Sequence, residues 1–253
     1  MSAWRHGLVA GLAGLAVLSL MAPAAMAASV TLPSVSINPG ASAGPSQTIG
    51  LLALLTLLAF MPALLLTMTA FTRVITVLSF LRSALGLQQT PPNQVLIGLA
   101  LFLTFFIMAP TLSAINHAAL QPYLQGRLTL TAAGARALGP LRLFMYHQTR
   151  PSDLALFLRL DHVKPPHSLK QVPTVALIPA FIISELKTAF EIGVYIYIPF
   201  VVIDMVVSTI LMSMGMMMVP PTLISLPLKL LLFVLANGWS LVVQSLVMSF
   251  HGG

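Results

Sequence analysis

The densest charged group beside an apolar segment is Ser184–Glu191. Lys187 and Glu191 are four residues apart, so on a helix they would share one face and pair, which leaves Glu185 for another partner. Charges beside a membrane span are costly unless they are paired or functional. We therefore expect these residues to form ion pairs between helices or between subunits, and we favour pairing between subunits. One alternative is that the charges only mark the start of a helix at the membrane boundary. The other, less favoured, is a proton relay.

Two further charges, Asp204 and Lys229, are isolated within long apolar segments. If the two segments form a helical hairpin, these residues lie at heights that differ by less than one turn, at a rise of about 1.5 Å per residue. A direct pair is then possible. The equal alternative is that each residue meets a neighbouring subunit.

Between these two charges lies a methionine-rich stretch. Five of the seven residues from 212 to 218 are methionine, namely Met212, Met214, Met216, Met217 and Met218, with Gly215 among them and Pro220-Pro221 close behind. Methionine is unbranched and polarizable, so it repacks against partners of different shape. Copper(I) binding by thioethers and ordinary core packing are the alternatives. We favour a deformable surface, typical of a seal or channel.

Enzymatic chemistry finds little support in the sequence. Zincin and phosphate-loop motifs are absent from it, and its carboxylates and histidines are scattered. A Ser184/Lys187 dyad, as an intramembrane protease would need, is a weak signal. With no cysteine there is no thiolate catalysis and no cysteine metal site. We expect no enzyme, no metal and no cofactor.

Composition points to a membrane protein. Of the 253 residues, 58% are hydrophobic and only 7% are charged, against about 25% charged in soluble domains. The net charge is +7, but the basic residues are not clustered with aromatic ones, so the pattern excludes a nucleic-acid stripe. We expect membrane lipid to surround part of the protein.

Residues 1–28 have the features of a cleavable signal peptide, and residues 29–48 those of a disordered leader rich in Ser, Pro and Gly. The alternative is an uncleaved first span, but the apolar part is short for one.

Four segments are long and apolar enough to span a membrane: Ile49–Thr69, Val95–Ile115, Ile192–Val219 and Leu223–Phe250, with a short apolar approach at Val172–Ser184. We therefore expect an all-α protein with helical hairpins over residues 49–116 and 172–253, the second carrying the Met-rich loop. Prolines interrupt these segments at Pro62, Pro110, Pro179, Pro199 and Pro227. The prolines predict broken helices that are buried inside an assembly.

The polar stretch 117–171 carries seven Arg or Lys residues and two Asp residues. Its segments Leu138–Tyr146 and Ser152–Leu160 are apolar at helical spacing, with Ser152 a candidate N-cap, so we expect a small basic helical domain. A cleaved signal places residues 69–94 inside as a loop and this domain outside, in the periplasm. The positive-inside rule prefers the reverse, but it weakens for loops of this length.

Several strings resemble the FliP family of flagellar type III export-gate proteins, which is related to the SctR proteins of injectisomes. They are residues 68–82, 85–96 and 184–193, and residues 212–221 running on into 224–233. Together with the intervening spans they cover most of residues 49–250. The signal, the leader and the 117–171 domain match only in general character.

The resemblance implies a multi-pass protein of the bacterial inner membrane, within the flagellar basal body. It implies a pentameric homo-oligomer whose helices form a pore-forming ring, raised out of the bilayer plane, with FliQ and FliR and next to an FlhB-like subunit. Unfolded flagellar proteins would pass through this ring. The methionine loop is then a gasket around the pore, centred on Met216, Met217 and Met218. We expect Gly215 to allow a close approach of the loop and the proline pair to hold its exit.

The sequence also fits two alternative functions less well. Injectisome export-gate homologues share much of the pattern, although the Gln88–Asn93 string and the signal favour the flagellar system. A small-solute transporter would need converging polar groups at membrane depth, where the sequence offers only Asp204 and Lys229.

Overall fold

The computed structural model describes residues 45–163, 171–216 and 218–251. The chain forms two compact units, residues 1–52 and 53–253. The expected signal peptide and most of the expected leader lie outside the described residues. Within them, the regular elements are helices: α2 (Pro45–Met68), α3 (Phe71–Ala84), α4 (Asn93–Ile115), the π-helical turn η1 (Asn116–Leu120), α5 (Gln121–Leu124), α6 (Leu130–Gln148), α7 (Pro151–Leu160), α8 (Thr174–Ser213), α9 (Pro221–Leu235) and α10 (Gly238–His251). The all-α prediction is confirmed for this part of the chain.

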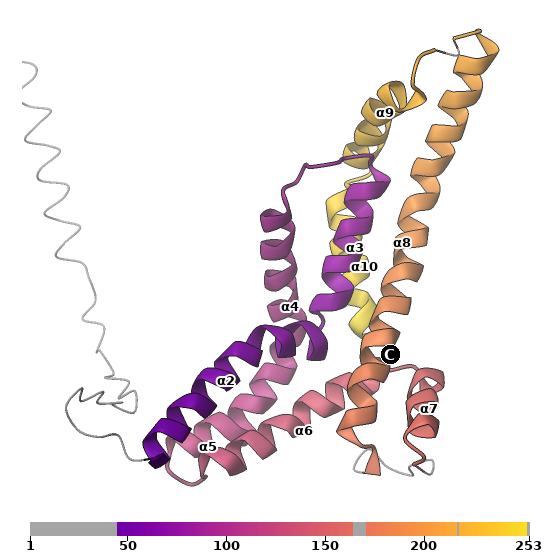
Figure 1. The fold of residues 1–253 in the computed structure, drawn as a ribbon. Coiled ribbons are helices and arrows are strands. Elements are labelled where there is room, and N and C mark those ends of the chain that lie inside the picture. Colours follow the sequence, from indigo (N-terminus) through magenta and orange to yellow (C-terminus); the bar gives the residue numbers. More distant parts are fainter. Residues whose placement is uncertain (1–44, 164–170, 217, 252–253) are drawn as a thin grey trace, which may run out of the picture. The chain divides into compact units, whose positions relative to one another are not determined.

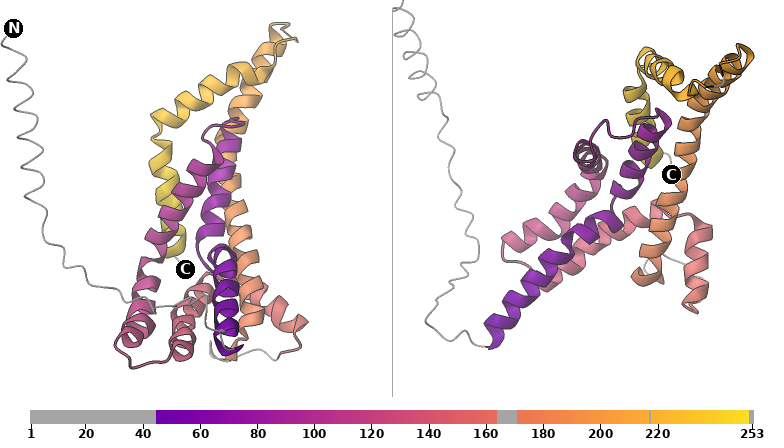
Figure 2. Two further views of the ribbon diagram at one scale, coloured as in Figure 1. Left: turned by 60° about the vertical axis from the view of Figure 1, so that its left-hand side comes forward. Right: turned by 45° about the horizontal axis from the view of Figure 1, so that its top comes forward.

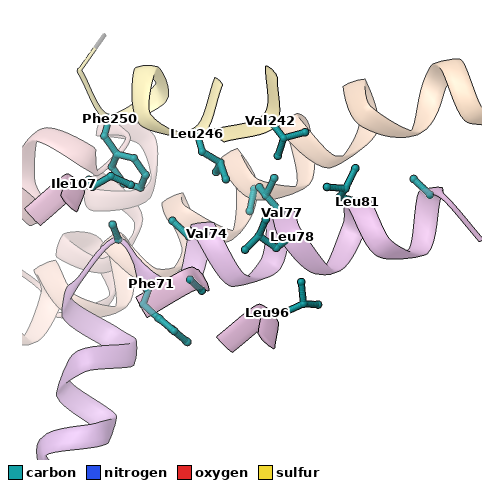
Figure 3. Packing of buried hydrophobic residues seen from close by; sticks show 14 of the residues in the cluster. Phe71, Val74, Val77, Leu78, Leu81, Leu96, Ile107, Val242, Leu246 and Phe250 are labelled. Carbon is teal, nitrogen blue, oxygen red and sulfur yellow. The ribbon is translucent and has the colours of Figure 1, made fainter. Parts of the chain in front are cut away.

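Helix α3 is the centre of the larger unit. It packs along α8 and α4 (Figure 1). Its apolar residues recur at helical spacing, so they form a stripe that must be buried. Figure 3 shows this stripe, with Phe71, Val74, Val77, Leu78 and Leu81, facing Val242, Leu246 and Phe250 of α10 and Leu96 and Ile107 of α4.

The position of α3 corrects the expectation of a loop at residues 69–94. The loop was expected because these residues connect two candidate spans, and they include two arginines, Arg73 and Arg82. One of them, Arg73, is only 2% exposed and is paired inside the unit. Its partner lies 112 residues away in the sequence, so a local pattern could not show it.

The candidate spans also differ from those expected. Within the part of the chain that the structure describes, two stretches are long and apolar enough to cross a membrane, Asn93–Leu124 and Thr174–Ser213. Up to four spans result if each bent pair counts as one: Pro62–Met68 with Phe71–Ala84, bent by 79°, and Pro221–Leu235 with Gly238–Phe250, bent by 65°. The short approach at 172–184 is the beginning of α8, which runs for 40 residues.

Prolines do not break the helices, contrary to the expectation. Pro62, Pro110, Pro179, Pro199 and Pro227 all lie inside helices. A proline removes one backbone hydrogen bond, and in an apolar bundle neighbouring groups compensate for it.

The bend between α9 and α10 falls instead at Asn237-Gly238. Asn237 has a φ of +51°, a left-handed conformation that ends a helix. Its amide donates to the carbonyl of Val234 at 3.0 Å, as in a helix-terminating motif. Helix α10 then turns away from α9 at 65°, as Figure 2 shows, and contacts α4. The Asn-Gly pair was a readable turn signal in the sequence.

The polar stretch 117–171 is helical where it is described, but it is not a separate domain. Helix α6 packs on α4 and α8, and α7 packs on α8 (Figure 1). A second apolar cluster joins these parts, with Met68, Met145, Val172, Leu177 and Phe181. Ser152 is not the cap of α7, because Pro151 takes the first helical position and Arg150 is the cap residue.

Replacement of Gly238 tests the close packing at the α9–α10 bend. A Cβ atom at residue 238 would lie 2.2 Å from the ring of Phe233, which is itself buried. Gly238→Ala should therefore lower the stability by about 1–3 kcal/mol, as overpacking does, measured as the apparent Tm in detergent. Gly98→Ala is the control, because nothing lies within 4 Å of its Cβ position. Equal Tm values for the two variants would contradict this packing.

Candidate functional site

A buried arginine joins four helices. Arg73 of α3 binds Glu185 of α8 in a two-point contact, with Nε to Oε2 at 2.9 Å and Nη2 to Oε1 at 2.5 Å. Nη1 donates to the carbonyl and to the hydroxyl of Ser249 in α10, both at 3.0 Å. Nη2 also donates to Oε1 of Gln148 in α6 at 3.1 Å. The guanidinium lies 3.8 Å from the ring centre of Phe250, a cation–π contact.

Glu185 was predicted to have a partner other than Lys187 or Glu191, and that partner is Arg73. Sequence reasoning missed Arg73 as a site residue. The available signal was the carboxylate itself, because a fully buried Glu requires a cation with several donors. Glu185 has no exposed side-chain surface, so the pair is shielded from water and its loss would be costly.

A second charged cluster fixes the beginning of α7 to α8. Asp153 is buried and accepts hydrogen bonds from Lys187 and from the Ser184 hydroxyl. Arg150 binds Glu191 through both terminal nitrogens, at 2.9 and 2.5 Å. The expected Lys187–Glu191 pair is therefore replaced by two pairs that link α8 to the neighbouring segment. Both of these pairs lie within the chain and join different helical segments.

The electrostatics of this cluster favour the ionised form of Asp153. Burial pushes the pKa of Asp153 upward, but hydrogen bonds from Lys187 and Ser184 and the charges of Lys187 and Arg150 outweigh burial, so its pKa lies below the usual value. The resulting stabilisation is present at neutral pH and is lost as the pH falls through the lowered pKa of the folded state. The Ser184 hydroxyl is buried and donates to Asp153, so it is not placed as a nucleophile.

Asp204 and Lys229 form a direct pair across the α8–α9 hairpin. Lys229 Nζ donates to Asp204 Oδ2 at 2.6 Å and to the carbonyl of Ala84 in α3 at 3.4 Å. Of the two alternatives for these charges, the structure has the pair within the chain. The other oxygen of Asp204, Oδ1, is buried and has no hydrogen-bond partner in the described chain.

The methionine loop, residues 212–218, connects the end of α8 to the loop before α9. Helix α8 ends in a Schellman motif: the amide of Met216 donates to Leu211 at 3.0 Å, and that of Gly215 to Met212 at 3.1 Å. Gly215 has a φ of +75°, the left-handed conformation that this motif requires. Nothing lies within 4 Å of its Cβ position. The structure therefore gives Gly215 a conformational role at the end of α8.

The exit of the loop is set by the proline pair. Pro220 is the cap residue of α9 and Pro221 occupies the first helical position, where a missing N–H costs nothing. Between these two fixed ends, Met212, Met214, Met216 and Met218 are all exposed in the isolated chain. Met217 lies outside the described residues.

The described parts of the chain bring no three His, Asp or Glu side chains together as metal ligands. The site therefore consists of charge clusters that hold helices together and a loop that presents thioethers. Such an arrangement can position a soft apolar surface on a firm support.

Replacement of Arg73 tests the four-helix contact. Arg73→Gln leaves Glu185 buried without its cation and should lower the stability by about 3–5 kcal/mol, measured as the apparent Tm in detergent. The double variant Arg73→Gln/Glu185→Gln removes both charges and should lose less. Glu191→Gln is the control, since the Arg150–Glu191 pair is largely exposed and should matter much less. A double variant that is no more stable than the single variant would refute the unpaired-charge explanation.

Replacement of Gly215 tests the helix end. Gly215→Ala has space for its methyl group but adopts the left-handed conformation at a cost of about 1–2 kcal/mol. Gly215→Asn should lose less, since Asn tolerates this conformation. Circular dichroism melting of both variants measures the difference, and identical losses would exclude a conformational role.

The chain was compared with known proteins. The FliP family model matches residues 54–246. The chain is similar to the flagellar biosynthetic protein FliP of Bacillus subtilis, with 57% identity over 81% of this chain and 93% of that protein. It is 49% identical to FliP of Pectobacterium carotovorum over 98% of this chain and 93% of that one. FliP of Caulobacter vibrioides is 47% identical over 98% and 92%.

These matches include α3, α8, the methionine loop and α9, which carry the ion pairs and the turn described above. The chain belongs to the FliP family, whose members are components of the flagellar export apparatus and not enzymes.

Proposed function

We propose that the protein is a core subunit of the flagellar type III export gate in the bacterial inner membrane. In this proposal, several copies form a pentameric ring with FliQ and FliR, next to an FlhB-like subunit, and unfolded flagellar proteins pass through it. The polar helices between α4 and α8 are periplasmic. The similar proteins are named as flagellar, which favours this system over an injectisome.

The observation that carries the proposal is the geometry of the methionine loop. The loop lies at the end of the long α8–α9 hairpin (Figure 1), and its four described methionines are exposed, with little to pack against in the chain. Apolar side chains held in this way need a partner, and copies of the same loop around a ring supply one.

A methionine ring suits the passage of unfolded chains. Side chains of every size must slide through, so a rigid lock would fail. Flexible thioether side chains exclude water and ions when the pore is empty, and they yield to a peptide with few specific contacts. Gly215 and the proline pair fix the backbone on both sides of the flexible side chains.

The charged residues give the ring its support. The pair of Asp204 and Lys229 joins α8 to α9 behind the loop, so the loop is presented by a braced hairpin. A transporter site is less well supported, because these two charges already satisfy one another.

Truncation of the loop tests the seal. In cells that express the chain with its partner subunits, the triple variant Met216→Ala/Met217→Ala/Met218→Ala should leak ions while the assembly still forms, because the ring has lost its apolar bulk. Ion flux and the size of the solubilised complex are measured together. The matched control is Met205→Ala/Met248→Ala, which truncates exposed methionines outside the loop and should not leak. An intact assembly without leak would place the seal elsewhere.

A further inference from the structure

We propose that the methionine loop is a site of reversible oxidation, at which hydrogen peroxide converts thioethers to sulfoxides and opens the seal. This inference rests on the proposed function, since it concerns the regulation of the same seal. The softness that lets methionine yield to a passing chain comes from a polarizable sulfur, and that sulfur is also the oxidisable atom.

Exposure separates the loop from the methionines of the core. Met218 is 96% exposed, and Met212 and Met214 are more than half exposed. Met108 and Met145 are 2% and 0% exposed. Because oxidation requires access to the sulfur, peroxide should modify the loop before the core. In a ring, the methionines at the two faces of the constriction border the aqueous sides of the pore, so peroxide can reach them although the constriction itself is dry.

The chain lacks cysteine, the residue that usually competes with methionine for peroxide. Cysteine thiolates react with it readily, but this chain contains no cysteine. Within this subunit, therefore, the exposed thioethers are the sulfur atoms available to the oxidant. Of the 14 methionines in the chain, five are gathered in the loop, so oxidation would be concentrated where the pore is closed.

The reaction balances without any group from the protein. A lone pair of the methionine sulfur attacks one oxygen of the peroxide, an S–O bond forms and the O–O bond breaks. The second oxygen leaves as hydroxide and takes the proton from the new S–OH group, which gives the sulfoxide and water. The sulfur is oxidised by two electrons and the peroxide is reduced. Methionine sulfoxide reductases reverse the change with electrons from a thiol reductant.

The product alters the property on which the seal depends. A sulfoxide is polar and accepts hydrogen bonds, so water can wet a constriction that the thioethers had kept dry. The turn itself survives, because it is held by backbone hydrogen bonds from Met216 to Leu211 and from Gly215 to Met212. The change therefore affects the side chains while the backbone of the loop keeps its conformation, which makes the change reversible.

The test uses the chain with its partner subunits in membrane vesicles that are treated with hydrogen peroxide. Peptide mass spectrometry compares the sulfoxide content of the loop with that of Met108 and Met145. We expect the loop to be oxidised first. Ion leak should rise with loop oxidation toward that of the Met216→Ala/Met217→Ala/Met218→Ala variant, and it should return to the starting level after treatment with the reductases.

Two variants locate the response. Replacement of all five loop methionines by Leu keeps apolar side chains but removes the oxidisable sulfur, so the leak of this variant should not change with peroxide from its own untreated level. Met205→Leu/Met248→Leu removes exposed methionines elsewhere and should respond like the parent. Equal responses of the parent and the five-Leu variant would overturn the inference.

The failure of this inference can be told apart from that of the proposed function. If the alanine variant leaks but full oxidation of the loop leaves the parent sealed, the gasket stands and the oxidation switch is wrong. If the alanine variant forms the assembly and does not leak, the proposal of a methionine gasket is wrong. The oxidation switch, which depends on the gasket, is then wrong as well. If the loop is oxidised no faster than Met108 and Met145, the switch is refuted by chemistry alone.

Discussion

The arrangement of the larger unit depends on burying one guanidinium in an apolar bundle. An arginine side chain has five N–H donors and cannot lose its charge in a protein. Burial is therefore tolerable only if all five find acceptors, and Arg73 finds them on three different helices. That requirement fixes α3 against α8, α6 and the end of α10 at one point. The apolar stripe of α3 then has a defined set of surfaces to pack on.

This constraint also explains which parts of the fold the sequence could reveal. Apolar length predicted α4 and the helical nature of α8 and α9, and helical spacing predicted α6 and α7. The ion pairs could not be predicted from local sequence, because Glu185 and Lys187 have partners 112 and 34 residues away along the chain. Local spacing suggested Lys187 with Glu191, and both instead bind the segment that begins at Arg150. By contrast, the bend at Asn237-Gly238 was missed although its signal was local and readable.

The expectation that prolines break the helices was wrong for a related reason. In a soluble helix, an internal proline costs roughly 3 kcal/mol and usually ends the element. Inside α8, Pro179 and Pro199 are accommodated, and the breaks occur where a left-handed residue or the short Thr69–Ala70 link ends a helix. In a long apolar helix that must span a bilayer or an assembly, continuity is favoured strongly, because each unpaired backbone group outside a helix is costly.

Two parts of the 40-residue helix α8 have opposite mechanical properties, and the helix separates them by about 30 Å at 1.5 Å per residue. In its first half, Ser184, Glu185, Lys187 and Glu191 are bound to neighbouring segments by buried or charge-assisted contacts. At its end, the methionine loop has a fixed backbone and side chains with few contacts. A seal needs both properties, because soft side chains close a pore only if their backbone does not move away under load. In the proposed seal, the Asp204–Lys229 pair, on the last turns before the loop, stiffens the hairpin without adding a charge to the methionine surface.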